Sequence, residues 1–281
     1  MILVTGITGQ LGYDVVKELE RRGEDFIGTT RKEIDLSDPE SAKNFILEKK
    51  PDAVIHCAAY TAVDKAEEEA ELALTVNGLA TRKIAEACRE VGAKMLYIST
   101  DYVFGGDGET PYEISDEKAP QNIYGKSKLL GEDSVIALLR NYFIIRISWA
   151  FGSNGKNFVK TMLNFDKRRK KIKVVDDQVG SPTYTADLAP LLVDMINSDK
   201  YGIYHATNEG FCSWAEFAEE IFKQAGYKIA VEKIPTSDYP TPAKRPFNSR
   251  LSKKSLDEAG FNRLPTWQDA VTRFLADNKK K

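Results

Sequence analysis

Short β-rich runs alternate with amphipathic stretches along the first half of the chain, and this rhythm leaves few possible folds. The β-rich runs cover Met1–Thr5, Asp25–Thr30, Ala53–His56, Lys94–Ser99 and Tyr142–Ile147. Helices are predicted between or after them at Gln10–Arg22, Asp38–Lys49, Glu69–Val91, Ile123–Leu139 and Phe158–Arg169. Alternation of this kind is typical of βαβ units, which build a parallel sheet with helices on both faces.

A glycine-rich turn joins the first strand to the first helix. Residues 6–12 read G-I-T-G-Q-L-G, with glycines at Gly6, Gly9 and Gly12. Glycines let the backbone approach a pyrophosphate closely, and a helix N-terminus supplies N–H donors and the positive end of the helix dipole. Three glycines in a turn can also serve tight packing alone. Their place between a first strand and an amphipathic helix favours a dinucleotide-binding site.

The end of the second strand indicates which dinucleotide is bound. An acidic residue there holds a ribose 2′-hydroxyl, whereas arginine suits a 2′-phosphate. The segment at 28–31 reads G-T-T-R and has no acidic residue, so Arg31 favours NADPH, with NADH as the alternative. Asp35 and Leu36 follow closely enough to reach the adenine, although Asp35 could instead cap the next helix.

A tyrosine and a lysine at helical spacing suggest hydride chemistry. Tyr124 and Lys128 are four residues apart in a predicted helix, so their side chains share one face. A phenol has a pKa near 10, and a neighbouring cation favours the phenolate and lowers that pKa. Thr100, at a strand end, could donate a hydrogen bond to the substrate oxygen with which Tyr124 exchanges a proton. Together with the glycine turn, this trio predicts reduction of a carbonyl or oxidation of a carbinol.

Beyond about Ser148 the rhythm loosens, and glycine and proline become frequent. We interpret this part as a smaller, loop-rich lobe interleaved with returns to the first sheet, because ligands lie outside the carboxyl ends of such strands. The predicted fold is α/β: a Rossmann-type, doubly wound parallel sheet with a smaller, interleaved C-terminal α/β substrate lobe. We expect an NAD(P)-binding domain at 1–150, with returns at roughly 183–206, and a substrate lobe mainly at 151–281.

Composition narrows the possible partners. The 281 residues are 42% hydrophobic and carry 40 Lys+Arg against 42 Asp+Glu, spread along the chain, which argues against nucleic-acid binding. No apolar run approaches the roughly 18 residues of a membrane span, and no cationic leader precedes the first strand. Cys57, Cys88 and Cys212 are widely separated, which predicts reduced thiols in a cytoplasmic protein. With two histidines and no paired-cysteine spacing, no metal site is predicted.

Several segments spread over nearly the whole chain carry a family resemblance. They lie at residues 6–12, 58–67, 99–104, 174–183, 202–206, 213–214 and 245–249. In these segments the chain resembles the dTDP-4-dehydrorhamnose reductases, which are extended short-chain dehydrogenases/reductases. The resemblance implies NAD(P)H-dependent reduction of the C4 ketone of dTDP-4-dehydro-β-L-rhamnose to dTDP-β-L-rhamnose, a step of dTDP-L-rhamnose biosynthesis, by a monomer or homodimer.

The resemblance also implies roles for individual residues. The catalytic trio falls on Thr100, Tyr124 and Lys128, with Tyr124 as the proton donor and Lys128 also contacting the nicotinamide ribose. Cofactor contacts fall on the glycine turn with Gln10 and Leu11, and on Arg31, Asp35, Leu36, Ala58, Ala59 and Tyr60. Thr100, Asp101 and Trp149 match positions that contact the sugar nucleotide in the family. We also predict substrate contacts at Val103, Phe104 and Arg245.

Two of these substrate residues have plain structural alternatives. Trp149 offers a flat apolar face to a sugar or base, but a Trp that ends a buried strand is core about as often. Arg245 could bind the diphosphate, or it could form a surface salt bridge. Some members of the family dimerise through Mg²⁺ held by carboxylates, and Asp14 and Asp187 fall near such positions. Both are shorter than the Glu expected there, so Mg²⁺ is possible but not predicted.

Four other functions share these features. A nucleotide-sugar 4-epimerase or another 4-ketoreductase would use the same cofactor site and the same Tyr124/Lys128 pair. Related 4,6-dehydratases have the motif Thr-Asp-Glu after the fourth strand, and its glutamate acts as a base. This chain has Tyr102 in place of that glutamate. A non-catalytic NADP(H)-binding regulatory subunit would have the same fold, although such a protein would be expected to lack one of the three catalytic groups.

Overall fold

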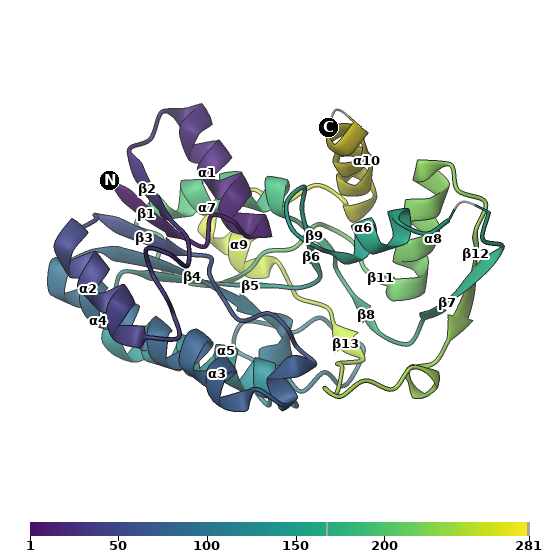
Figure 1. Cartoon of the computed structure of the whole chain (residues 1–281), viewed down its shortest axis with the longest axis horizontal. Coiled ribbons are helices and arrows are strands. Elements are labelled where there is room, and N and C mark those ends of the chain that lie inside the picture. Colours follow the sequence, from purple (N-terminus) through teal and green to yellow (C-terminus); the bar gives the residue numbers. More distant parts are fainter. Residues whose placement is uncertain (167, 280–281) are drawn as a thin grey trace.

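A six-stranded parallel sheet forms the centre of the molecule (Figure 1). The structure is a computed structural model and describes residues 1–166 and 168–279. Its strand order is β2-β1-β3-β4-β5-β10. The strands are β1 (Ile2–Thr5), β2 (Phe26–Thr29), β3 (Ala53–His56), β4 (Lys94–Thr100), β5 (Tyr142–Ile147) and β10 (Gly202–His205). The five strands expected in the first half are confirmed. The order reverses between β1 and β3, which is where ligands bind in sheets of this kind.

Helices cover both faces of this sheet (Figure 1). One face carries α1 (Gln10–Arg22), α7 (Thr185–Ile196) and α9 (Lys254–Ala259). The other carries α2 (Pro39–Lys49), α3 (Ala70–Leu74), α4 (Ala80–Val91) and α5 (Ile123–Leu138). The apolar stripe of α1 shows why these helices pack as they do, because Leu11, Val15 and Leu19 recur at i, i+4 and i+8 and are all buried. The doubly wound fold is therefore confirmed.

Two predicted helices differ in detail. The run expected at 69–91 contains a π-helical turn at Thr75–Leu79 between α3 and α4. The helix expected at 158–169 is shorter, because α6 (Phe158–Leu163) ends well before Arg169. The backbone N–H of Arg168 donates to the Asp166 carboxylate at 2.9 Å. This local side-chain hydrogen bond offers the backbone an alternative to the helix.

A second lobe is built around its own apolar core (Figure 1). Its helices are α6, α8 (Trp214–Ala225) and α10 (Trp267–Lys279). Its strands pair as β6 (Ala150–Phe151) with β9 (Thr183–Tyr184), and β7 (Lys171–Val175) with β12 (Ala230–Ile234). A third small sheet has the order β11 (Cys212–Ser213), β8 (Val179–Gly180) and β13 (Asn248–Ser249). Short 3₁₀ turns lie at Lys65–Glu67, Asp101–Val103 and Thr236–Asp238.

The later part of the chain returns to the large sheet. Helix α7 packs in the core of that sheet through Leu188 and Leu192, and β10 pairs with β5. Helix α9 also reaches this core, through Leu256. The chain thus crosses between the two lobes several times. Among the described residues, no helix combines the length and the apolar content that crossing a membrane requires.

Candidate active site

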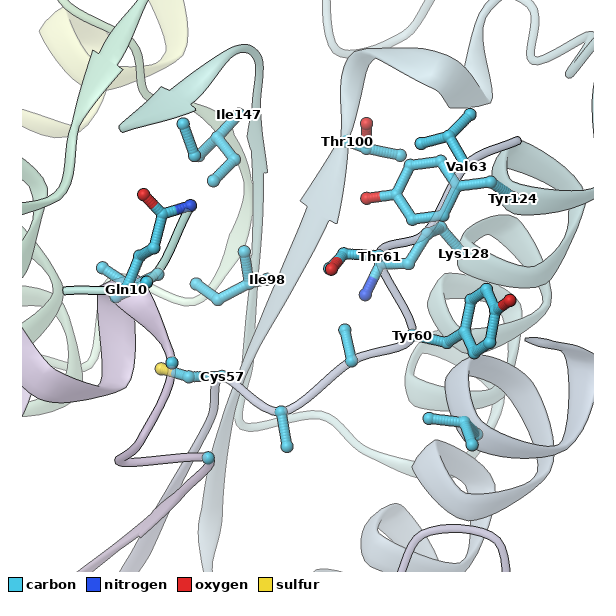
Figure 2. A pocket seen from close by; sticks show the side chains of 18 of the residues that line it. Gln10, Cys57, Tyr60, Thr61, Val63, Ile98, Thr100, Tyr124, Lys128 and Ile147 are labelled. Carbon is cyan, nitrogen blue, oxygen red and sulfur yellow. The ribbon is translucent and has the colours of Figure 1, made fainter. Parts of the chain in front are cut away.

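A cavity of about 1110 Å³ lies along the carboxyl ends of the central strands, where the strand order reverses. Figure 2 shows Gln10 and Ile147 on one side of it and Tyr124, Lys128 and Thr100 on the other. The structure brings most of the predicted site residues to this one cavity: Gly6, Gly9, Gln10, Leu11, Arg31, Asp35, Leu36, Ala58, Ala59, Tyr60, Thr100, Asp101, Tyr124, Lys128, Trp149 and Arg245.

The glycine turn forms a cradle that larger residues would fill. Gly6 has a φ of 73°, and a Cβ atom there would lie 2.8 Å from the backbone of Ala58. Gly12 does not line the cavity; its Cβ atom would lie 2.3 Å from the carbonyl oxygen of Gly6, so its role is close packing. Helix α1 begins after Gly9, and no side chain caps it. Its first-turn N–H groups therefore suit the oxygens of a pyrophosphate.

The cavity carries a cation just beyond the end of β2. Arg31 is exposed, and its Nε atom lies 3.4 Å from a carboxylate oxygen of Asp35. Asp35 accepts hydrogen bonds from the backbone N–H and the hydroxyl of Ser37, which lower the pKa of its carboxyl. Asp35 does not cap α2. Asp38 does, by accepting from the backbone N–H of Glu40. This leaves Asp35 and Arg31 together at the cavity edge.

Asn77 holds the segment after β3, and sequence reasoning missed it. It lies in the π-helical turn and is 1% exposed. The side-chain carbonyl of Asn77 accepts from the backbone N–H of Tyr60 at 2.8 Å. Its side-chain NH₂ group donates to the Tyr60 backbone carbonyl at 3.0 Å and to the Ser127 hydroxyl at 2.9 Å. Asn77 thus ties the segment beside the cofactor cradle to the helix that carries Tyr124 and Lys128. Local π-helical turns are frequent at functional sites, but only the folded chain shows this one, and the sequence carried no signal for Asn77.

Helix α5 presents Tyr124 and Lys128 to the cavity from one face (Figure 2). The helix begins at Asn122, whose side chain accepts from the backbone N–H of Gly125 at 2.8 Å. The Lys128 ammonium lies 4.1 Å from the ring centroid of Tyr97, and the residue is 3% exposed. Burial lowers the pKa of Lys128 to about 7, against a smaller opposing effect of the Glu132 carboxylate.

The structure corrects the expected direction for Tyr124. Burial raises the pKa of its phenol above the ordinary value, while a hydrogen bond with the Thr100 side chain opposes the rise. Lys128 does not reverse it, because burial also disfavours the charged form of Lys128. Tyr124 therefore keeps its proton at neutral pH. A protonated phenol beside a second hydroxyl can deliver a proton to a developing alkoxide.

Asp101 is a buried acid at the substrate end. It is 3% exposed and accepts from the Thr100 hydroxyl at 3.0 Å, and burial raises the pKa of its carboxyl to about 6. Val103 and Phe104 do not reach the cavity. They pack with Leu251 in a small core, so their assignment to the substrate site is corrected. Val103 ends the 3₁₀ turn and Phe104 follows it, and both side chains pack inward while Asp101, at the start of the turn, lines the cavity.

Arg245 forms the ion pair that was one of its two expected roles, and its binding of a diphosphate stays a prediction. It lines the cavity, and it also forms an ion pair with Asp64, 2.6 Å apart. Its guanidinium donates a second hydrogen bond, at 3.2 Å, to the hydroxyl of Tyr102. The Tyr102 ring in turn meets the Tyr124 ring edge-on, with centroids 5.5 Å apart. Tyr102 is thus a cavity residue that sequence reasoning treated only as the replacement of a glutamate.

A family model described as the RmlD substrate binding domain matches residues 1–280. The chain belongs to this RmlD family. It is 40% identical to the spore coat polysaccharide biosynthesis protein SpsK of Bacillus subtilis, over 98% of this chain and 97% of that protein. It is 37% identical to the dTDP-4-dehydrorhamnose reductase of Escherichia coli, over 98% and 96% of the two chains. The crystal structure of dTDP-4-dehydrorhamnose reductase from Bacillus anthracis in complex with NADP superposes with a TM-score of 0.95 at 42% identity, covering 98% of each chain. The resemblance drawn from the motifs is confirmed.

In this RmlD-family chain the two carboxylates considered for Mg²⁺ have other partners. Asp14 accepts a hydrogen bond from the Thr185 hydroxyl. Asp187 forms an ion pair with Arg273 and accepts from the Asn208 amide at 2.7 Å. Over residues 1–166 and 168–279, no group of three or more His, Cys, Asp or Glu residues is arranged to hold a metal ion.

Trp214 is a second residue of this RmlD-family site that sequence reasoning missed as a cavity residue. It comes from the second lobe, lines the cavity and stacks on Trp149. Its motif, Ser213-Trp214, lies far along the chain from Thr100, Tyr124 and Lys128. The only signal was that the motif belongs to the family resemblance.

Proposed function

We propose that this protein is an NAD(P)H-dependent oxidoreductase that reduces the C4 ketone of dTDP-4-dehydro-β-L-rhamnose to dTDP-β-L-rhamnose. The observation that carries the proposal is the meeting of Tyr124, Lys128 and Thr100 in the same cavity as the glycine cradle. Relatives named dTDP-4-dehydrorhamnose reductase over nearly the full chain support it. So does the NADP bound in the similar Bacillus anthracis enzyme.

The cofactor, when bound, supplies the hydride. The glycine cradle and the N-terminus of α1 would hold its pyrophosphate, because their backbone geometry leaves room and donors for it. Ala58, Ala59 and Tyr60 would lie along its other side, held in place through Asn77. We propose NADPH as the preferred form and NADH as the alternative, because Arg31 can pair with a 2′-phosphate.

The catalytic residues divide the work on the ketone. The Thr100 and Tyr124 hydroxyls would hydrogen-bond the ketone oxygen and orient the carbonyl carbon. Tyr124 would give its proton to that oxygen as negative charge develops, which its raised pKa permits because the phenol is protonated at neutral pH. Lys128 would hydrogen-bond the nicotinamide ribose and, in its cationic form, stabilise the phenolate that remains.

The substrate end would hold the rest of the nucleotide sugar. Asp101 can bond sugar hydroxyls, Trp149 offers an apolar ring, and Arg245 has guanidinium donors for the diphosphate. We propose that residues 1–150, with the returns at about 183–206, bind the cofactor and that residues 151–281 mainly bind the sugar nucleotide. We also propose a cytoplasmic monomer or homodimer that binds no nucleic acid, in keeping with three free cysteines and a near-neutral net charge.

Transfer of an isotope label tests the reaction directly. The protein is incubated with dTDP-4-dehydro-β-L-rhamnose and NADPH deuterated at the transferable position, and the product is examined by NMR. We expect dTDP-β-L-rhamnose with deuterium at C4 of the sugar. No NADPH oxidation with this ketone, together with interconversion of dTDP-β-L-rhamnose and its C4 epimer in a separate incubation, would instead indicate a 4-epimerase. NADPH binding without any turnover would indicate a regulatory subunit or another ketosugar as substrate.

A further inference from the structure

Trp149 has a strained backbone at the edge of the cavity. Its φ is 50°, in the left-handed region, and among the described non-glycine residues only Lys50 shares a positive φ. A bulky residue is strained in that region and persists there only where its surroundings hold it. Such strain concentrates at ligand sites.

Hydrogen bonds on both sides hold this backbone in place. The Trp149 carbonyl accepts from the backbone N–H of Thr183 at 3.2 Å. The Ser148 hydroxyl donates to the Ser181 carbonyl at 2.7 Å, and the Thr183 hydroxyl donates to the Ser148 carbonyl at 2.6 Å. The strand end is therefore tied to the 181–183 segment, and the strained conformation is fixed.

Register brings the Trp149 backbone to the edge of the sheet that also carries Thr100. Thr100 pairs with Ile147 across β4 and β5, and Trp149 lies two residues beyond Ile147. Thr100, Tyr124 and Trp149 all line the cavity, so a ligand ring that meets Trp149 lies in the same cavity as the two hydroxyls. In a nucleotide sugar the ring that carries the ketone is the sugar, and one face of the sugar presents apolar C–H groups. The base lies farther away, beyond the diphosphate.

Trp214 confines the indole of Trp149. The two rings are stacked, with centroids 3.7 Å apart and an angle of 15° between their planes. A Cβ atom on Gly180 would lie 3.1 Å from the Trp149 ring, so the ring is also approached closely by that backbone. These two contacts leave the Trp149 side chain little freedom to change its rotamer.

Trp214 is itself rigidly mounted. It is the first residue of α8, directly after Ser213, whose side chain and the Glu216 side chain form a reciprocal capping box. The Trp214 ring also contacts Phe158, with centroids 4.7 Å apart. The second lobe therefore presents Trp214 from a fixed helix start and not from a free loop.

We propose that Trp214 is a positioning residue for the nucleotide sugar: by stacking on Trp149 it fixes the aromatic wall against which the apolar face of the sugar packs. The inference rests on the proposed function and names a residue of its substrate end. Trp214 acts through Trp149, on binding of the sugar nucleotide, and has no part in hydride or proton transfer. We expect cofactor binding not to depend on Trp214, because the glycine cradle and the π-helical turn that carries Asn77 are on other elements.

The test compares three variants. Trp214→Leu removes the stack, Trp214→Phe keeps an aromatic ring, and Phe222→Leu is a matched core change elsewhere on α8, where Phe222 is 2% exposed and does not line the cavity. Steady-state kinetics with dTDP-4-dehydro-β-L-rhamnose, NADPH affinity and Tm are measured for each. We expect Trp214→Leu to raise KM for the sugar nucleotide about 10-fold, equivalent to about 1.4 kcal/mol, with kcat within about twofold of wild type and NADPH affinity unchanged.

The controls separate positioning from simple stability. Trp214→Phe is expected to recover most of the KM, and Phe222→Leu to lower Tm without changing KM. An unchanged KM in Trp214→Leu, or an equal rise of KM in Phe222→Leu, would overturn the proposal. If the wild-type protein does not turn over the sugar nucleotide, the proposed function fails. The stack is then read from its far-ultraviolet exciton circular dichroism, which Trp149→Phe and Trp214→Phe should both abolish.

Discussion

The Lys128 ammonium lies 4.1 Å from the ring centroid of Tyr97, so the cation of the catalytic pair is buried against an aromatic ring. A carboxylate, Glu132, opposes the effect of burial only in part, and the pKa of Lys128 falls from 10.5 to about 7. A buried cation with a lowered pKa destabilises the folded state. Lys128 is therefore kept for what it does in the cavity, at a cost in stability.

Replacing Lys128 is expected to stabilise the protein while it removes activity. Between about pH 7 and pH 10.5 the unfolded chain holds the Lys128 proton and the folded chain does not, so this residue makes stability rise with pH across that window. Below pH 7 its full cost is present. Lys128→Met should raise the free energy of unfolding by roughly 2–4 kcal/mol at pH below 7, with a smaller gain as pH approaches 10.5.

Urea unfolding of the protein without cofactor, at two pH values, measures this. Lys126→Met is the matched control, because Lys126 lies on the same helix and is exposed. An equal effect of the two substitutions at both pH values would contradict the assignment of a buried, weakly protonated Lys128.

Asn77 is expected to affect stability and cofactor binding together. Asn77→Ala removes the partner of the Tyr60 backbone N–H and carbonyl and one of the two partners of the Ser127 hydroxyl, at a cost of about 2–3 kcal/mol. Because the Tyr60 segment lines the cavity, NADPH should also bind more weakly. Ser134→Ala removes an exposed hydrogen bond of α5 and serves as the control. A loss of stability with unchanged NADPH affinity would make Asn77 purely structural.

Arg31 is expected to set the preference between the two cofactors. A charge-assisted bond to a 2′-phosphate is worth about 1.5–3 kcal/mol, so Arg31→Ala should weaken NADPH binding roughly 10-fold to 100-fold and leave NADH binding unchanged. Calorimetric titration with each cofactor measures both affinities. Arg82→Ala, an exposed arginine on α4 paired with Glu86, is the control. A parallel loss of NADH affinity would show that Arg31 does not read the 2′-phosphate.

Chelators are expected to have no effect on this protein. The Asp187 carboxylate is already neutralised by Arg273, and the Asp14 carboxylate accepts from Thr185. We predict that EDTA leaves the activity and Tm unchanged and that added Mg²⁺ does not raise Tm. A Tm that rises with Mg²⁺ concentration would reveal a metal site and contradict this assignment.

Features that depend on the spacing of neighbouring residues could be predicted from the sequence. The glycine turn, the strands around it and the Tyr124/Lys128 spacing depend on neighbouring residues, and the structure places them as expected. The reversal of strand order that opens the cavity follows from the βαβ rule. The shortened α6 was missed because one hydrogen bond from Arg168 to Asp166 competes with the helix, and periodicity does not register it.

Features that depend on side-chain direction or on distant partners could not be predicted. Val103 and Phe104 belong to the same motif as Asp101, yet the 3₁₀ turn sends them into a core with Leu251. The raised pKa of Tyr124 depends on how deeply the folded chain buries the phenol.

Contacts between segments far apart in the chain were also out of reach. Asn77 meets Tyr60 and Ser127 across separate elements, and Trp214 meets Trp149 from the other lobe. A single sequence does not report such contacts.

Tyr124 is proposed to donate the proton in reduction of the ketone, and a single substitution tests this role. Tyr124→Phe keeps the ring and removes the hydroxyl, and oxidation of NADPH with dTDP-4-dehydro-β-L-rhamnose is followed by absorbance alongside NADPH binding. We predict that kcat falls by about 10²–10⁴ with NADPH affinity preserved. Wild-type turnover that persists within a few-fold in Tyr124→Phe would contradict the account.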